Sequence, residues 1–276
     1  MKKKPYKILL LADLKKSTSS MLKSTVSFAQ MIHGEIDFFY VKKAIDVVER
    51  DNQLSAIRSI NHDYTATDNK IKKLIKTASE NHQININYSC TIGNVKHEIS
   101  NQIKEIKPDI IVLGKKKSSP LNLVGDNITQ FILKQFDGTI LIADTNNVLE
   151  PHEKLSLGVL DANDTMLNTT ITESLMAHTD KPIKSFKIVK KTSNLHEATN
   201  SSTIDTIDYV FEHNDNSIDT LSNYVSKNNI NLLCLERSET GSKKKSKSAQ
   251  KDIRYIIDKL NVSLLLTGKK NYSLQK

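Results

Sequence analysis

Cysteine, proline and glycine are all scarce in this chain of 276 residues, which holds 2, 5 and 8 of them. So little proline and glycine leaves little room for long flexible linkers or collagen-like segments. Cys90 and Cys234 fall in apolar stretches in different halves of the chain. We therefore expect buried free thiols rather than a disulfide framework, in a protein of the reducing cytoplasm.

Long apolar runs are also missing. No stretch approaches the roughly 18 apolar residues that suggest a membrane-spanning helix, so we expect a soluble protein without a membrane partner. The run from Ile8 to Ala12 follows a basic start but stops at Asp13. Because a secretory signal has a longer apolar core and a small-residue cleavage site, we expect this run to form a first β-strand.

Familiar catalytic and metal-binding patterns are absent as well. The eight histidines are scattered singly, with no pair spaced to share a helix face around zinc. No Gly-x-Ser-x-Gly elbow, Walker loop or cysteine and histidine arrangement nominates a nucleophile. We therefore expect no metal site, no catalytic residue and no conventional enzyme.

What the chain does have is a globular composition with a local excess of lysine. It is 38% hydrophobic and 26% charged, and its length suits two domains. The net charge is +9, and without seven lysines in two short loops it would be +2. A protein that binds duplex nucleic acid more often spreads basic residues over a helix face. The loop residues are Lys115, Lys116, Lys117, Lys243, Lys244, Lys245 and Lys247.

The first half alternates strand-like and helix-like segments. Gly34 is expected to end the first helix, and continuous apolar runs such as 109–114 are typical of strands covered on both faces. Alternation of this kind implies a parallel, doubly wound sheet of the α/β class. Strands are expected at residues 7–12, 35–41, 84–90, 109–114 and 138–143, and helices at 17–33, 64–81, 95–106 and 126–136.

The second half repeats the pattern in reduced form, with a connection between its second and third strands that is short for a full helix. Asn146, Asn147 and Pro151 interrupt the pattern between the halves. We therefore expect two tandem domains, residues 1–147 and 153–276, each with a parallel five-stranded sheet. Strands of the second are expected at 155–160, 183–189, 206–211, 231–236 and 262–268, and helices at 164–178, 218–227 and 253–260.

Over nearly all its length the first half resembles a universal stress protein domain. The resemblance rests on the strand before Asp13, the strand that ends at Val41, Gly93 before a helix, the run 108–114, and Gly125 before the last helix. It implies a Rossmann-like sheet of the adenine nucleotide alpha hydrolase-like class with strand order 3-2-1-4-5. In such a sheet the ends of strands 1 and 4 flank the topological switch point, where ligands bind.

The resemblance implies a ligand site at that switch point, where Asp13 and Gly114 should face each other. Asp13 and Asp161 could hold magnesium or a ribose hydroxyl, or could cap the segment that follows. The expected ligand-binding residues of the first half are Asp13, Val41, Gly114, Lys115, Lys117, Gly125 and Asn127. The weaker equivalent in the second half comprises Asp161, Lys243 and Lys244.

ATP-binding members of the family carry Gly, two residues, Gly, nine residues, then Gly and Ser or Thr, which cradle phosphates. Here Lys117 stands at the second glycine, the spacer to Gly125 is two residues short, and Asp126 replaces Ser or Thr. Leu14 replaces the glycine after Asp13, and the second half has no glycine pair. These departures argue against ATP binding in the family's own mode, more strongly in the second half. Lysine charge could instead have replaced backbone amides as the anion ligand, or the loops could simply be solvated.

Functions of different classes remain open. The first is a non-catalytic stress-response or signalling protein that weakly binds a nucleotide, such as ATP with magnesium, or another small anionic ligand, or that has lost the ligand and acts as a scaffold for a partner protein. The second is a nucleic-acid-associated protein that uses the lysine loops, and the third is a slow ATPase. A steep loss of affinity with rising salt would single out nucleic-acid binding.

The fifth strand of each half predicts how the halves assemble. Both runs should lie at a sheet edge, where bare apolar backbone invites aggregation. We expect the two edges to pair within one chain as an intramolecular pseudo-dimer, with both lysine loops in solvent, so that a homodimer of whole chains is optional. The residues expected to be buried are Ile140, Ile142, Leu264 and Leu266 or their alternating neighbours.

Overall fold

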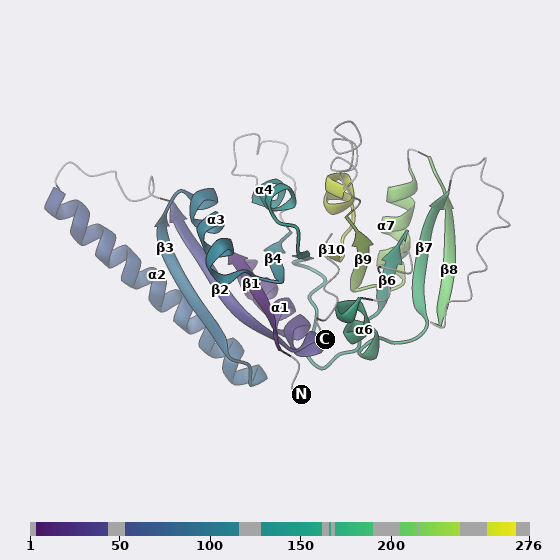
Figure 1. Cartoon of the computed structure of the whole chain (residues 1–276), viewed down its shortest axis with the longest axis horizontal. Coiled ribbons are helices and arrows are strands. Elements are labelled where there is room, and N and C mark those ends of the chain that lie inside the picture. The colour runs from purple at the N-terminus through teal and green to yellow at the C-terminus, as the bar shows by residue number, and fades with distance from the viewer. Residues whose placement is uncertain are drawn as a thin grey trace.

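The computed structural model describes residues 4–43, 53–115, 128–161, 166, 169–189, 205–214, 216–237 and 253–268. These residues form a ten-stranded sheet with the order β3-β2-β1-β4-β5-β10-β9-β6-β7-β8. Figure 1 shows the sheet crossing the whole molecule, with the first-half strands on the left and the second-half strands on the right.

Each half contributes five of the strands. Those of the first half are β1 (Tyr6–Ala12), β2 (Gly34–Lys43), β3 (Ile86–Gly93), β4 (Ile110–Gly114) and β5 (Thr139–Ala143). Those of the second half are β6 (Leu157–Leu160), β7 (Ile183–Val189), β8 (Thr206–Glu212), β9 (Leu232–Glu236) and β10 (Ser263–Thr267).

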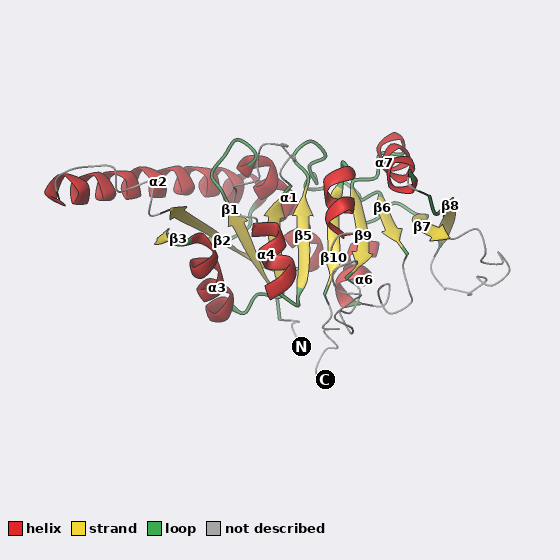
Figure 2. Ribbon diagram, turned by 90° about the horizontal axis from the view of Figure 1, so that it is seen from above, coloured by secondary structure: helices red, strands yellow, loops and turns green. Residues whose placement is uncertain are grey.

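Helices connect the strands and lie on both sides of the sheet (Figure 2). None of the described helices combines the length and apolar character needed to cross a bilayer. The first half contains α1 (Thr18–Ile32), α2 (Gln53–His82), α3 (Val95–Ile106) and α4 (Ile128–Gln135). The second half contains α6 (Thr170–Ala177), α7 (Ser217–Lys227) and a further helix at residues 253–259.

All neighbouring strands within a half run parallel, and the two halves meet through one antiparallel pair, β5 with β10. The order within the first half is 3-2-1-4-5, and the second half repeats it as β8-β7-β6-β9-β10. The predicted fold class, two tandem doubly wound sheets, is therefore confirmed.

Both faces of the sheet are buried along its inner strands, as their continuous apolar runs predict. One apolar layer lies under α1, α2 and α6, and the other lies under α3, α4 and α7. Each layer runs from one half into the other, since Leu141 and Leu265 share the first layer and Ile140 and Leu264 share the second. The halves are thus joined through their cores rather than through a polar surface contact.

The predicted pairing of the two fifth strands is confirmed. Ile142 lies opposite Leu264, and Ile140 lies opposite Leu266. All four side chains are at most 1% exposed. Because each strand takes the edge of the other, neither β5 nor β10 presents a bare edge to solvent.

The segment between β5 and β6 packs on α1. The Leu149 amide donates to Ser24 Oγ at 3.0 Å, and Ser27 Oγ donates to the Glu150 carbonyl at 3.1 Å. Leu149 itself is fully buried. These contacts explain why α1 buries serine side chains, and they make the connecting segment a packed part of the molecule.

Several expected boundaries are wrong. His33, in the left-handed conformation at φ 56°, ends α1, and Gly34 is already the first residue of β2. The helix expected from residue 64 begins at Gln53; Leu54, Ile57 and Ile60 already continue its apolar spacing toward the N-terminus. The helix expected from residue 164 begins at Thr170, after an N-cap from Thr169. The connection between β7 and β8 that was expected to lack a full helix falls at 190–204, outside the described residues.

Candidate functional site

The ends of β1 and β4 bring together the first two residues expected at the site. Leu11 pairs with Leu113, so Asp13 and Gly114 leave neighbouring strands at the same end of the sheet. Ala12 pairs with Tyr40 on the other side, which brings Val41 level with Asp13. The expectation that Asp13 and Gly114 flank the switch point is therefore confirmed.

Asp13 holds the turn that leads into α1. Its Oδ1 accepts hydrogen bonds from the Lys15 amide at 3.2 Å and from Thr18 Oγ1 at 3.3 Å. The turn includes Leu14 in the left-handed conformation, at φ 53°. Both hydrogen bonds from described residues use Oδ1, so Asp13 caps the turn while Oδ2 makes no hydrogen bond to them.

Gly114 allows β4 to lie close to α1. A Cβ atom on this residue would come within 3.0 Å of Met21 Sδ, which is tighter than ordinary van der Waals contact. Met21 thus fills the space beside the Gly114 backbone, and a larger residue at this position would have to displace it. This is the position at which the second half carries Glu236.

Sequence reasoning missed two lysines, of which Lys70 lies beside this switch point and Lys42 lies near the end of β2. Lys70 on α2 donates to the Leu14 carbonyl at 2.8 Å, and Lys42 at the end of β2 pairs with Asp63 at 3.0 Å. The hydrogen bond and charge of Lys42 lower the pKa of Asp63. No motif marks Lys70, because its partner is a backbone carbonyl 56 residues away.

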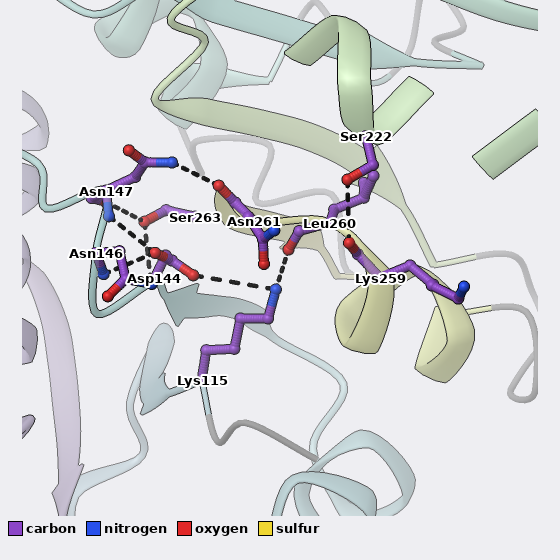
Figure 3. A network of polar contacts seen from close by, with 9 residues as sticks. All are labelled: Lys115, Asp144, Asn146, Asn147, Ser222, Lys259, Leu260, Asn261 and Ser263. Atoms are coloured by element: carbon purple, nitrogen blue, oxygen red, sulfur yellow. Dashed lines mark hydrogen bonds and ion pairs between the residues drawn. The ribbon is translucent and has the colours of Figure 1, made fainter. Parts of the chain in front are cut away.

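Lys115 does not lie in solvent, which corrects the expectation for this part of its loop. Its side chain is only 7% exposed, and its Nζ lies 4.0 Å from Asp144 Oδ2. The Nζ also donates to the Leu260 carbonyl of the second half (Figure 3). Burial lowers the pKa of Lys115, an effect that Asp144 and Asp258 oppose. The pairing of β5 with β10 causes this placement, because it brings the second half within reach of the residue after β4.

A polar network surrounds Lys115 and joins the two halves (Figure 3). Asp144 Oδ1 accepts hydrogen bonds from the amides of Asn146 and Asn147, each at 2.8 Å. The Asp144 amide donates to Ser263 Oγ at 3.0 Å, and Asn147 Nδ2 donates to the Asn261 carbonyl. Asp144 is 3% exposed, so its charge depends on these partners rather than on water.

Arg237 makes the reciprocal contact from the other half. It follows β9 as Lys115 follows β4, and it is 7% exposed. Its Nη1 donates to the Phe136 carbonyl at 2.7 Å, and its Nη2 donates to the Gly138 carbonyl. Phe136 and Leu260 each follow the last helix of their own half. Carbonyl groups at helix ends attract cations. Each half therefore holds the other through a cation bound to a carbonyl group that follows a helix.

We call β5, β10 and the contacts of Lys115, Asp144 and Arg237 across them the seam. Its two ends differ in charge, because Gly268 stands in the second repeat where the first has Asp144. Burial lowers the pKa of Arg237, an effect that Asp137 opposes. Arg237 Nε has no hydrogen-bond partner among the described residues. The Lys115 end therefore holds a buried carboxylate that the Arg237 end lacks.

The second switch point has a different character. Asp161, at φ 45°, accepts from the Ile188 amide at 3.0 Å through Oδ1, and so binds β7. Partial desolvation raises the pKa of Asp161, and the Ile188 hydrogen bond opposes this. Leu160 pairs with Leu235, which brings Glu236 next to Asp161. β9 thus ends in a carboxylate where β4 ends in Gly114, and a negative charge at this position disfavours a phosphate.

The remaining expected site residues cannot be placed in this way. Lys117, Gly125, Asn127, Lys243 and Lys244 lie outside the described residues. Among the residues that are described, no group of three or more His, Cys, Asp or Glu side chains could hold a metal ion.

Comparison with known proteins agrees with this geometry. The sequence model of the universal stress protein family matches residues 5–143, half of the chain. The chain belongs to the universal stress protein family. No curated protein matches it at a significant level.

Solved structures extend the likeness to both halves of this universal stress protein. A universal stress protein from Archaeoglobus fulgidus DSM 4304 is similar with a TM-score of 0.64 at 11% identity, covering 96% of this chain and 98% of its own. A functionally unknown protein from Pseudomonas aeruginosa PAO1 is similar with a TM-score of 0.57 at 9% identity, covering 95% and 92%. At such identities the likeness concerns the fold.

Proposed function

We propose that this universal stress protein acts by binding rather than by catalysis, as a stress-response or signalling protein. Its first half takes a nucleotide or another small anionic ligand weakly, at the switch point between β1 and β4. The observation that carries the proposal is the contrast between the two switch points. Asp13 and Gly114 flank the first, with Lys70 bound to the Leu14 carbonyl nearby, whereas at the second β9 ends in Glu236, a carboxylate at the position of Gly114.

Weak rather than tight binding follows from where Lys115 goes. A phosphate needs amide or cationic donors, and the first cation after β4 is bound to Leu260 and Asp144 in the seam. Asp126 adds a negative charge where family members that bind ATP have Ser or Thr. Asp13 remains suited to a ribose hydroxyl, since its Oδ2 makes no hydrogen bond to a described residue.

The placement of Lys115 also favours a small ligand over nucleic acid. Nucleic-acid binding draws its affinity from solvent-accessible cations that replace counterions on the phosphates. Lys115 is one of the seven loop lysines that carry the positive excess, and its side chain is 7% exposed. Nucleic-acid binding would therefore have to rely on the positive charge of other residues.

Thermal unfolding with ATP and magnesium tests the proposal. Ligand at a concentration near its Kd adds about 0.4 kcal/mol, so we expect millimolar ATP to raise the Tm by only about 1–2 °C. Asp13→Asn keeps Oδ1 for Lys15 and Thr18 but removes the charge, and it should reduce this shift. Asp161→Asn, the matched change at the second switch point, should leave the shift intact.

Three outcomes would contradict the proposal. A rise of many degrees would show tight binding, and equal loss in both variants would place the ligand elsewhere. A shift that disappears between 50 and 200 mM salt would favour a polyanion held at the surface. Native mass spectrometry of the purified chain then identifies any ligand that it retains.

A further inference from the structure

The seam and the first switch point share one part of the chain. Gly114 lies at the switch point, and Lys115, the next residue, places its ammonium group in the seam. The Lys115 amide continues the ladder between β4 and β5 by donating to the Ala143 carbonyl at 2.8 Å. The switch point and the seam are therefore only one peptide unit apart along the chain.

The ammonium group of Lys115 is only partly satisfied by its described partners. It has three donor hydrogens, and the described residues supply one carbonyl, from Leu260, and one carboxylate oxygen of Asp144 at 4.0 Å. That distance is at the limit of an ion pair rather than a close hydrogen bond. A phosphate oxygen next to Gly114 would be a stronger partner, because hydrogen bonds between charged groups are the strong ones.

The Arg237 end of the seam differs from the Lys115 end. Arg237 lies after Glu236, a carboxylate that disfavours an anion there, and its guanidinium is bound to two carbonyl groups. Arginine also keeps its charge and its fork of donors when buried. The Arg237 end of the seam should therefore hold when the Lys115 end is disturbed.

We propose that an anionic ligand at the first switch point competes with the seam for Lys115, so that occupancy of the site loosens the Asp144 end of the seam while the Arg237 end stays closed. This inference rests on the proposed function and names how that site is regulated. Site and seam are linked thermodynamically, so whatever weakens the hold of the seam on Lys115 strengthens the binding of the ligand.

The linkage is tested by equilibrium binding of ATP, followed by NMR on the full chain. Asp144→Asn keeps Oδ1 as an acceptor for Asn146 and Asn147 but removes the charge that holds Lys115. ATP should then bind about fivefold tighter, at the low end of couplings between sites. As a control, Asp219→Asn removes an exposed carboxylate of α7 that pairs with Lys259 at 2.9 Å, next to Leu260 but outside the seam, and it should not change the affinity.

A double-mutant cycle separates competition from general loosening. In a Lys115→Met background the seam and the ligand no longer share a cation, so Asp144→Asn should have no effect on ATP affinity. Hydrogen exchange of the wild-type chain gives an independent readout, should Asp144→Asn fail to fold. Adding ATP should speed exchange at residues 144–147 and 261–263 but leave Gly138 and Gly268 unchanged.

The outcomes distinguish this inference from the proposed function. If ATP binds the wild type but Asp144→Asn binds it no more tightly, or if the gain persists with Lys115→Met, the competition does not exist and the binding function stands. Unchanged exchange at 144–147 on ATP binding would also overturn the competition. If ATP binds none of these proteins, the proposed function fails, and this inference fails with it.

Discussion

Single residues at the seam decide how closely the two halves can approach. Gly268 follows β10 and lies against the start of β5, where a Cβ atom would be 2.4 Å from the Asp137 carbonyl oxygen and 2.6 Å from the Gly138 carbonyl carbon. Backbone atoms cannot move aside as a flexible side chain can. No glycine among the described residues has a positive φ, so the requirement at Gly268 is one of space and not of backbone conformation.

Gly268→Ala should therefore destabilise the chain by about 1–3 kcal/mol, as overpacking of a core does. Gly93→Ala is the control, because there the nearest atom to an added Cβ is Glu98 Oε1, the far end of a flexible side chain at 2.9 Å. That variant should stay within about 0.5 kcal/mol of wild type. Urea unfolding measures the stability of both variants. If Gly268→Ala is as stable as Gly93→Ala, the backbone at the seam moves readily to make room for the added methyl group.

Cys234 should make the stability of the fold fall in alkali. Complete burial raises the pKa of its thiol to about 12, whereas in the unfolded chain the thiol ionises near its ordinary value of 9.0. The stabilisation is thus complete below about pH 9 and is lost as pH rises toward 12, because only the unfolded state releases the proton.

Cys234→Val removes this titration and keeps the site apolar. Between pH 8 and pH 10 the wild type should lose about 1.4 kcal/mol more stability than the variant, as measured by urea unfolding at each pH. Since both proteins share every other titrating group, the difference isolates Cys234. Parallel pH profiles would mean that the folded thiol ionises as readily as the unfolded one.

At the residue scale, the sequence located Asp13 and Gly114 but misplaced Lys115. A residue at the end of a strand is positioned by its own repeat, which the apolar pattern reveals. The direction of the Lys115 side chain depends instead on Leu260, 145 residues away in the sequence. Position in a loop says nothing about such a partner, so the lysine run suggested solvent.

At the scale of single elements, two exposed asparagines at helix N-termini allow a matched test of capping. The Asn94 side chain accepts from the His97 amide at 3.2 Å at the start of α3, whereas Asn216 at the start of α7 makes no such bond. Asn94→Ala should cost about 1 kcal/mol of stability and Asn216→Ala only a few tenths. Thermal unfolding of the two variants checks this, and equal losses would show that the Asn94 cap adds nothing.

Elements were predictable where local pattern dominates. The strands β4, β5 and β9 are continuously apolar and were found within a residue or two of their bounds. The bounds of α3 were predicted correctly, because Gly93 precedes the helix and Pro108 follows it. The start of α2 at Gln53 was missed, because the ends of an element are the part of it that a sequence pattern defines least well.

At the scale of the whole molecule, each repeat covers the exposed sheet edge of the other, since β5 pairs with β10. We propose residues 1–147 and 153–276 as the two domains, joined by a segment that itself packs on α1. Pairing β5 with β10 leaves β3 and β8 as the outer strands of the sheet. The tandem arrangement was predictable because unpaired apolar edges must be covered. The contacts that Lys115 and Arg237 each make with the opposite half were not predictable.

Separating the domains should expose what the seam covers. A fragment of residues 1–147 would present β5 as a bare apolar edge, leave Asp144 and Lys115 without Ser263 and Leu260, and expose Ile140 and Ile142. Such an edge pairs with another copy or aggregates. We expect the fragment to form dimers or to precipitate, which light scattering over a range of concentrations measures.

Adding the complementary fragment provides the control. Residues 153–276, co-expressed with 1–147, should restore the seam and yield a soluble 1:1 complex, because β10 then occupies the edge of β5 in its native register. Arg237→Met in the second fragment removes its donors to Phe136 and Gly138 and should weaken this complex. If residues 1–147 remain monomeric and soluble at high concentration and do not bind the second fragment, edge protection is not the reason that the two domains share one chain.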